Sequence, residues 1–164
     1  MRVIGRVVLI LVLAFFSYQL LFTPDHWCFV DYFNLMVHEA GHLIFMLFGQ
    51  FLDILAGSAF QIFIPFLFLG YFLRRKEFFN SSVILFWIGD NVINVSRYMM
   101  DAQEMALPLL GGDGSIHDWN WLFIHMGLLD SSKFIATSFL ILGIMFLISS
   151  FVGMVSFTIK SSQE

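Results

Sequence analysis

The chain has 164 residues, of which 59% are hydrophobic and only 12% are charged, and its mean hydropathy is +0.86. These values lie far outside the range of soluble globular proteins and predict an integral membrane protein, with residues 1–164 forming one polytopic domain. A net charge of -4 without a long basic run excludes a nucleic-acid partner, and the single cysteine, Cys28, excludes an internal disulfide.

Five apolar segments follow one another along the chain, at about residues 3–22, 33–55, 58–73, 82–100 and 134–159. Their lengths suit transmembrane helices, which need about 20 apolar residues each. The first segment continues to Phe22 without a small-residue cleavage site, so we interpret it as a retained helix and not as a signal peptide. We expect an all-α bundle of four to five transmembrane helices in a lipid bilayer.

The basic residues constrain the topology, because short cytoplasmic loops are rich in Lys and Arg. Five simple crossings would place Arg2 and Arg6 opposite a second basic group, which comprises Arg74, Arg75, Lys76 and Lys160. All six residues share one side if the second or third segment does not cross, for example as a re-entrant segment that turns near residues 49–58 or at Pro65. We favour this four-crossing arrangement, which places the polar connection 101–131 on the external face.

The second segment contains "HEAGH", in which His38 and His42 are four residues apart. On a helix both imidazoles project from one face and can bind one Zn²⁺ at about 2.0 to 2.1 Å each. Glu39 points aside from that face, so its carboxylate suits a general base that acts on a water at the metal. Gly41 keeps the helix surface low where another backbone or a substrate could approach.

Asp31 and Asn34 continue the same face toward the start of the segment, so we expect them to accept hydrogen bonds from the two histidines. The alternative is that these polar residues are buried only by accident of packing. An ionisable residue in a membrane segment costs about 2.5 to 3.5 kcal/mol or more. That cost favours the metal site.

The fourth segment carries a polar stripe, in which Asp90, Asn94, Arg97 and Asp101 recur at intervals of four, three and four residues. Such a stripe must face the protein interior or a wet cavity. One explanation is an internal ladder with Arg97 between Asp90 and Asp101. The other is that Asp101, at the mouth of the helix, binds or orients the metal.

A catalytic zinc site needs a third protein ligand and an open position. The loop "LPLLGGDGSIHDWNW" provides His117, which we expect to be that ligand, while Asp118 and Asp101 are the alternatives. Four other side chains are interpreted as interfacial, structural or solvated: Trp119, Trp121, His125 and His26.

The motif "HEAGH" in an early membrane helix, followed by a Gly- and Phe-rich stretch and a distal Asp, resembles the site-2 protease class of intramembrane zinc metalloproteases. More narrowly, "HEAGHLIFMLFG", "GSAFQIFIPFLFLGYF", "YMMDAQEMALPLLGG" and "HDWNW" resemble a family of small bacterial membrane proteins with a peptidase-like motif, over most of residues 34–125. The resemblance implies a protein of the bacterial cytoplasmic (inner) membrane, with His38 and His42 as zinc ligands and Glu39 as the base. The Asn-Pro…Leu-Asp-Gly element of site-2 proteases has only a loose counterpart in "LPLLGGDG", which makes Asp113 a further candidate.

The expected function is therefore that of a membrane zinc metalloprotease, which cleaves a membrane protein or peptide in or near the bilayer. Two alternatives remain open at this point. The protein could bind or transport metal ions, in which case Glu39 is not specifically required. It could also be a non-catalytic relative that binds transmembrane partners.

Overall fold

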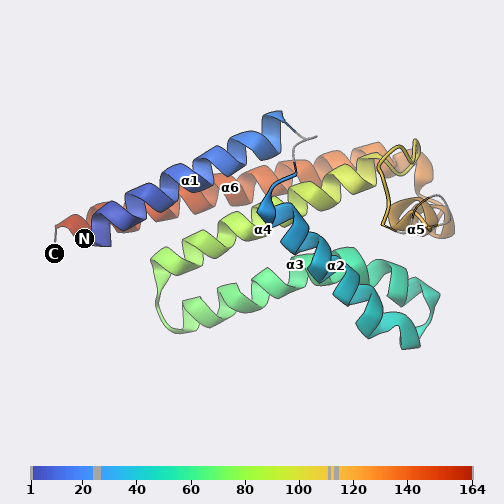
Figure 1. Ribbon diagram of the computed structural model, residues 1–164, viewed down its shortest axis with the longest axis horizontal. Helices are drawn as coiled ribbons and strands as arrows, with labels where there is room; N and C mark the ends of the chain where they lie inside the picture. Colours follow the sequence, from blue (N-terminus) through green and yellow to red (C-terminus); the bar gives the residue numbers. More distant parts are fainter. Residues whose placement is uncertain (1, 24–26, 111, 113–114, 164) are drawn as a thin grey trace.

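The computed structural model describes residues 2–23, 27–110, 112 and 115–163. Six α-helices account for most of them, in the order α1 (Arg2–Phe22), α2 (Phe29–Phe45), α3 (Gln50–Arg74), α4 (Phe78–Met100), α5 (Asp118–Met126) and α6 (Ser132–Ser162). Two short 3-10 turns, η1 (Met46–Phe48) and η3 (Leu129–Ser131), precede α3 and α6 (Figure 1). The described residues contain no strand, so the all-α class predicted from the sequence is confirmed.

Three helical segments in the described part of the chain are long and apolar enough to cross a membrane: Val3–Phe22, Gln50–Arg74 and Leu129–Ser162. They correspond to the first, third and fifth apolar segments of the sequence. The 17-residue α2 and the polar-striped α4 do not qualify. The three helices support a membrane protein, while the number of crossings and the re-entrant segment stay predictions.

The second apolar segment does not form one continuous helix. The chain turns after α2, at η1 and Gly49, whose φ of +96° is a conformation that glycine adopts without strain. The helix α3 then packs back along α2, and Gly41 lies at the contact. A Cβ on Gly41 would lie 2.8 Å from Phe60 Cβ and would also collide with the carbonyl oxygen of Ala56. The backbone of α3 therefore approaches α2 closely at Gly41, as expected from the absence of a side chain there.

The helix α4 lies at the centre of the fold, with many fully buried residues, and packs antiparallel along α6 (Figure 1). Close approach depends on a glycine pair, since a Cβ on Gly89 would lie 2.9 Å from the carbonyl oxygen of Gly143. One apolar cluster joins α4 to α3, α5 and α6 around Met99 and Phe123, and a second joins α4 to α1 and α6 around Ile93. Asp90 and Asn94 of the polar stripe are left to face α2.

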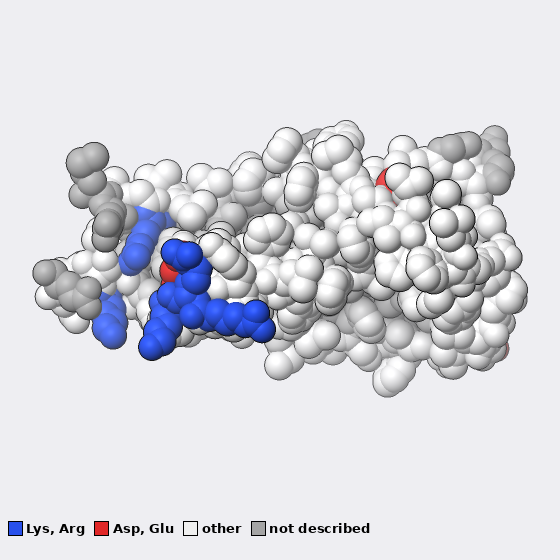
Figure 2. Space-filling view, turned by 90° about the horizontal axis from the view of Figure 1, so that it is seen from below, with Lys and Arg blue, Asp and Glu red and all other residues white. Residues whose placement is uncertain are grey.

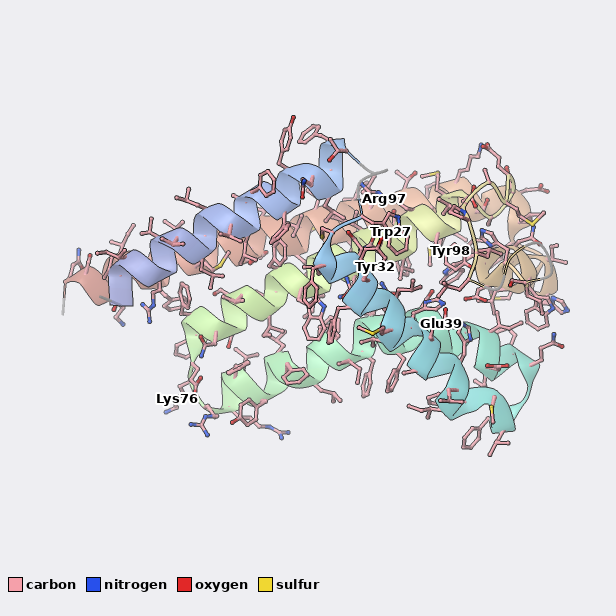
Figure 3. The ribbon with its side chains drawn as sticks, viewed as in Figure 1. Trp27, Tyr32, Glu39, Lys76, Arg97 and Tyr98 are labelled. Carbon is pink, nitrogen blue, oxygen red and sulfur yellow. The ribbon has the colours of Figure 1, made fainter. Side chains whose placement is uncertain are left out.

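The Lys and Arg side chains visible in Figure 2 gather toward one end of the molecule. Arg6 Nη1 donates to the carbonyl oxygen of Phe157 at 2.9 Å, and the rings of Phe78 and Phe157 stack at 5.5 Å. The start of α1, the α3–α4 turn with Lys76, and the end of α6 therefore share this basic end (Figure 3).

This arrangement predicts the outcome of cysteine labelling in cells. In a Cys28→Ser background, a membrane-impermeant maleimide should label Lys76→Cys and Ser161→Cys from one side. Asp130→Cys, in η3 at the other end of α6, should be labelled from the opposite side. Both topologies place positions 76 and 161 on one side, so labelling of the two from opposite sides would contradict the crossing of both α4 and α6. Five simple crossings would be supported if a cysteine added at the N-terminus were labelled from the side opposite to positions 76 and 161.

Candidate metal centre

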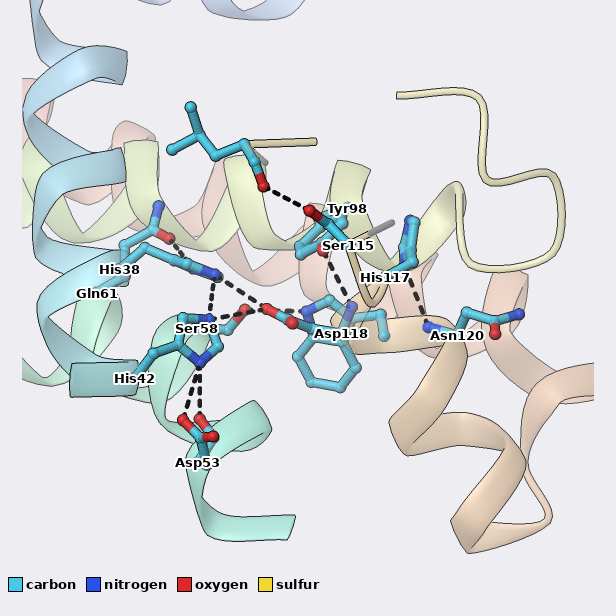
Figure 4. A network of polar contacts seen from close by, with 12 residues as sticks. His38, His42, Asp53, Ser58, Gln61, Tyr98, Ser115, His117, Asp118 and Asn120 are labelled. Carbon is cyan, nitrogen blue, oxygen red and sulfur yellow. Dashed lines mark hydrogen bonds and ion pairs between the residues drawn. The ribbon is translucent and has the colours of Figure 1, made fainter. Parts of the chain in front are cut away.

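Three potential metal ligands converge between α2 and the start of α5. His38 Nε2 and His42 Nε2 lie 3.1 Å apart, and Asp118 Oδ2 lies 3.0 Å from the first and 3.2 Å from the second (Figure 4). The predicted helical face of "HEAGH" is thus present, and α5 brings in a carboxylate from 80 residues away in the sequence.

The outer nitrogens of both rings are held by α3. His38 Nδ1 lies 3.3 Å from Gln61 Oε1, and His42 Nδ1 lies 2.8 Å from the carbonyl oxygen of Asp53. Both partners are hydrogen-bond acceptors, so each Nδ1 carries the proton and donates it. In its neutral form, each ring then directs the lone pair of its Nε2 at the common centre, as metal-binding histidines do.

Three acceptor atoms facing one another repel unless a cation or a proton lies between them. In a tetrahedral zinc site with bonds of about 2.0 to 2.1 Å, neighbouring ligand atoms lie about 3.3 Å apart. The separations of 3.0 to 3.2 Å found here are close to that value. His38, His42 and Asp118 could therefore hold a metal ion and leave a fourth position open.

Gly57 of α3 makes room for the two rings. A Cβ at this position would lie 2.5 Å from His38 Nε2 and 2.5 Å from His42 Nε2. Any larger residue would displace the nitrogens that converge on Asp118. Asp53, Gly57 and Gln61 follow at intervals of four residues and form the wall of α3 behind the site.

His117 lies outside this group of ligands. Its Nδ1 accepts a hydrogen bond from the backbone N–H of Asn120 at 3.2 Å, as the N-cap of α5, so its Nε2 carries the proton and donates to Asp101 Oδ2 at 3.1 Å. The backbone N–H of Asp118 donates to Tyr98 Oη at 3.0 Å. His117 and Tyr98 thus fix the start of α5 and the carboxylate that follows.

Asp101 also orders the loop that precedes α5. Its carboxylate accepts hydrogen bonds from the backbone N–H groups of Ala106 at 2.9 Å and Leu107 at 3.0 Å. Burial acts to raise the pKa of the Asp118 carboxyl. In the absence of a metal ion, a proton on a ring nitrogen takes the place of the cation, and the hydrogen bonds with His38 and His42 then hold the pKa of this carboxyl below its usual range. Asp118 is accordingly a carboxylate, the form that binds metals.

Glu39 lines a cavity of about 600 Å³ that the three potential ligands also border (Figure 3). The Glu39 side chain is exposed, whereas His38, the preceding residue of the helix, is buried. The carboxylate therefore borders the cavity without belonging to the ligand group, as the sequence predicts.

Two residues of the polar stripe, Asp90 and Asn94, contact α2 at the edge of the same cavity. Asn34 Nδ2 donates to Asp90 Oδ2 at 2.6 Å, and Asn94 Nδ2 donates to Asp31 Oδ1 at 3.2 Å. The prediction that Asp31 and Asn34 serve as acceptors for the histidines is wrong, because their side chains pair with α4 and α3 supplies the acceptors.

The internal ladder with Arg97 between Asp90 and Asp101 stays a prediction. Arg97 Nη2 donates to the carbonyl oxygen of Leu20 near the end of α1. The guanidinium therefore also ties α4 to α1 at the rim of the cavity.

Trp119 is not an interfacial anchor. It is 7% exposed, and its indole N–H donates to Ser58 Oγ at 3.0 Å. The interfacial assignment is wrong because α5 folds inward onto α3. Two further residues considered from the sequence, Asp113 and His26, lie outside the described residues.

No protein-family model, curated protein or solved structure matches this chain.

A Gly57→Ala variant tests the crowding behind the rings. We expect it to lose most of its bound zinc, because the new methyl group would push both Nε2 atoms apart. Gly5→Ala in α1 is the matched control, since a Cβ there meets nothing within 4 Å. Zinc content per chain, measured on purified protein whose helicity is unchanged, should fall only for Gly57→Ala, and equal contents would contradict the packing argument.

The choice of third ligand predicts an order of zinc affinities. Asp118→Ala removes a donor atom and should abolish stoichiometric binding. His117→Ala loosens the start of α5 and should cost about 10- to 100-fold, as is typical when a residue that orients a ligand is lost. Zinc titration of both variants measures this, and the reverse order would make His117 the ligand.

Proposed function

We propose that this protein is a zinc-dependent membrane hydrolase that cleaves a peptide bond in or near the bilayer. The observation that supports this most is the convergence of His38 Nε2, His42 Nε2 and Asp118 Oδ2 beside a cavity that Glu39 also lines. In this proposal Asp118 is the third ligand and His117 supports it.

Two imidazoles and one carboxylate are a donor set that zinc favours in catalytic sites, with a fourth position left for water or substrate. A zinc ion held by His38, His42 and Asp118 would supply the acidity that lowers the pKa of a bound water to about 7 and would polarise the carbonyl group of the substrate. Gln61 and Asp53 keep both rings in the tautomer that binds.

Glu39 acts as the general base in the proposed reaction. Being next to His38 on the helix, its carboxylate cannot complete the same ligand set, but it shares the cavity in which water would be held. Glu39 takes the proton from the attacking water and transfers it to the nitrogen of the leaving amine. Such proton transfers typically contribute about 10²- to 10⁴-fold to the rate.

The lining of the cavity fits a peptide with apolar side chains. One wall carries the polar groups Asp31, Asn34, Asp90 and Asn94, which can keep water in an otherwise apolar protein. The cavity is also lined by apolar residues of the loop before α5: Leu107, Leu109, Leu110 and Ile116. A membrane protein segment that is cleaved beside this loop would meet both kinds of surface.

Replacing Glu39 by Gln separates hydrolysis from metal binding. We expect Glu39→Gln to retain zinc and to lose proteolysis at least 100-fold, because the amide cannot accept the proton. The measurement is the mapping of newly formed protein N-termini in the membrane fraction of cells that express each variant. Glu104→Gln, the same change at an exposed residue paired with Lys133, is the control and should match the wild type.

New N-termini within or beside transmembrane segments should depend on Glu39. If Glu39→Gln produces the same termini as the wild type, the proposed base is wrong. If zinc is bound but no termini arise even with the wild type, proteolysis is wrong. Zinc uptake into vesicles that is indifferent to Glu39→Gln would then favour metal transport.

A further inference from the structure

A groove of about 420 Å³ runs along the last turns of α3 at the basic end of the molecule. It is lined by pairs of residues spaced four apart on one helical face: Phe66, Leu67, Gly70, Tyr71, Arg74 and Arg75. Its two halves differ in chemistry, because apolar side chains form one half and guanidinium groups form the other.

Gly70 forms the floor of the groove. A Cβ at this position meets nothing within 4 Å, so any side chain there would project into open space and fill the groove. Phe66 and Leu67 are 40% and 53% exposed. The apolar half is thus an open channel along the outer surface of α3, and it is open because Gly70 has no side chain.

Arg75 is held in position at the mouth of the groove. Its Nε donates to Glu77 Oε1 at 2.7 Å, and its Cζ lies 5.5 Å from the centre of the Tyr71 ring. The terminal nitrogens of Arg75 are not used by this hydrogen bond. Arg74 is exposed and has no ion pair or hydrogen bond with the part of the chain that the structure describes.

The charges at this mouth are unbalanced toward the positive sign. Arg74, Arg75 and Lys76 stand against Glu77 alone, and further basic residues lie at the same end (Figure 2). Guanidinium groups bind phosphate through paired N–H donors, and the excess charge favours an anionic over a zwitterionic headgroup.

The position of the groove along α3 matches the depth of a phospholipid. The helix has 25 residues and is about 37 Å long at about 1.5 Å per residue, which exceeds the roughly 30 Å hydrocarbon core. If α3 crosses the membrane, Arg74 and Arg75 reach the headgroup level and Phe66 faces the acyl chains.

We propose that this groove binds one anionic phospholipid, with its phosphate on Arg74 and Arg75 and one acyl chain along Phe66 and Leu67 over Gly70. The site depends on α3 as a membrane helix and is independent of the hydrolysis proposed at the metal centre. Free phosphate would bind to the arginines alone, whereas a lipid also contacts the apolar half of the groove. The apolar half therefore favours a lipid over free phosphate.

Native mass spectrometry of the full chain in detergent tests this site. Phosphatidylglycerol and phosphatidylcholine with identical acyl chains are titrated into delipidated protein. Wild type should retain one phosphatidylglycerol and bind phosphatidylcholine about tenfold more weakly. Arg74→Gln removes a phosphate contact, and Gly70→Leu fills the channel without changing the charge, so each should lower the phosphatidylglycerol affinity about tenfold or more.

Lys160→Gln is the matched control, because it removes one positive charge from the same end outside the groove and should leave the affinity unchanged. Equal binding of the two lipids by wild type would overturn the anionic selectivity. An equal loss in Lys160→Gln and Arg74→Gln would reduce the site to general attraction by the basic end. Unchanged binding in Gly70→Leu would remove the acyl chain from the groove.

Discussion

The contact of His38 and His42 with Asp118 is the interaction on which the arrangement of the central elements depends. It joins α2 to α5, which are distant in the sequence. Around it, α3 supplies the acceptors behind the rings and the space at Gly57, while Tyr98 of α4 holds the backbone of Asp118. Burying an ionisable group without a partner in an apolar protein has a high free-energy cost. Contacts between these groups therefore constrain the positions of the four helices.

Much of the site could be predicted from the sequence, because "HEAGH" and the polar stripe of α4 repeat at helical spacing. The acceptors on α3 were missed, although Asp53, Gly57 and Gln61 follow at intervals of four and mark one face of an otherwise apolar helix. Periodicity within a segment predicts which residues share a face. It does not predict which of two neighbouring helices that face meets, and for this reason Asp31 and Asn34 were assigned to the histidines.

The third potential ligand was harder to predict, because the residue that faces the histidines is determined by the backbone of an irregular loop. His117 and Asp118 are adjacent, and whichever residue caps α5 directs the other one elsewhere. In the structure His117 takes the capping position through its Nδ1, and Asp118, the first residue of the helix, faces the histidines. Imidazole is an unusual cap compared with Ser, Thr, Asp or Asn, so a preference for His as a zinc ligand outweighed the weaker signal of a helix start.

The two ends of the molecule differ in a way that bears on water access. The cavity at the metal centre is bordered by the last turns of α1 and α4 and by the loop before α5, all of which lie away from the basic end (Figure 1). If the basic end faces the cytoplasm, as the charge distribution favours, the cavity opens toward the external half of the bilayer. Water would then reach Glu39 from the external side, past the polar side chains of Asp31 and Asn94.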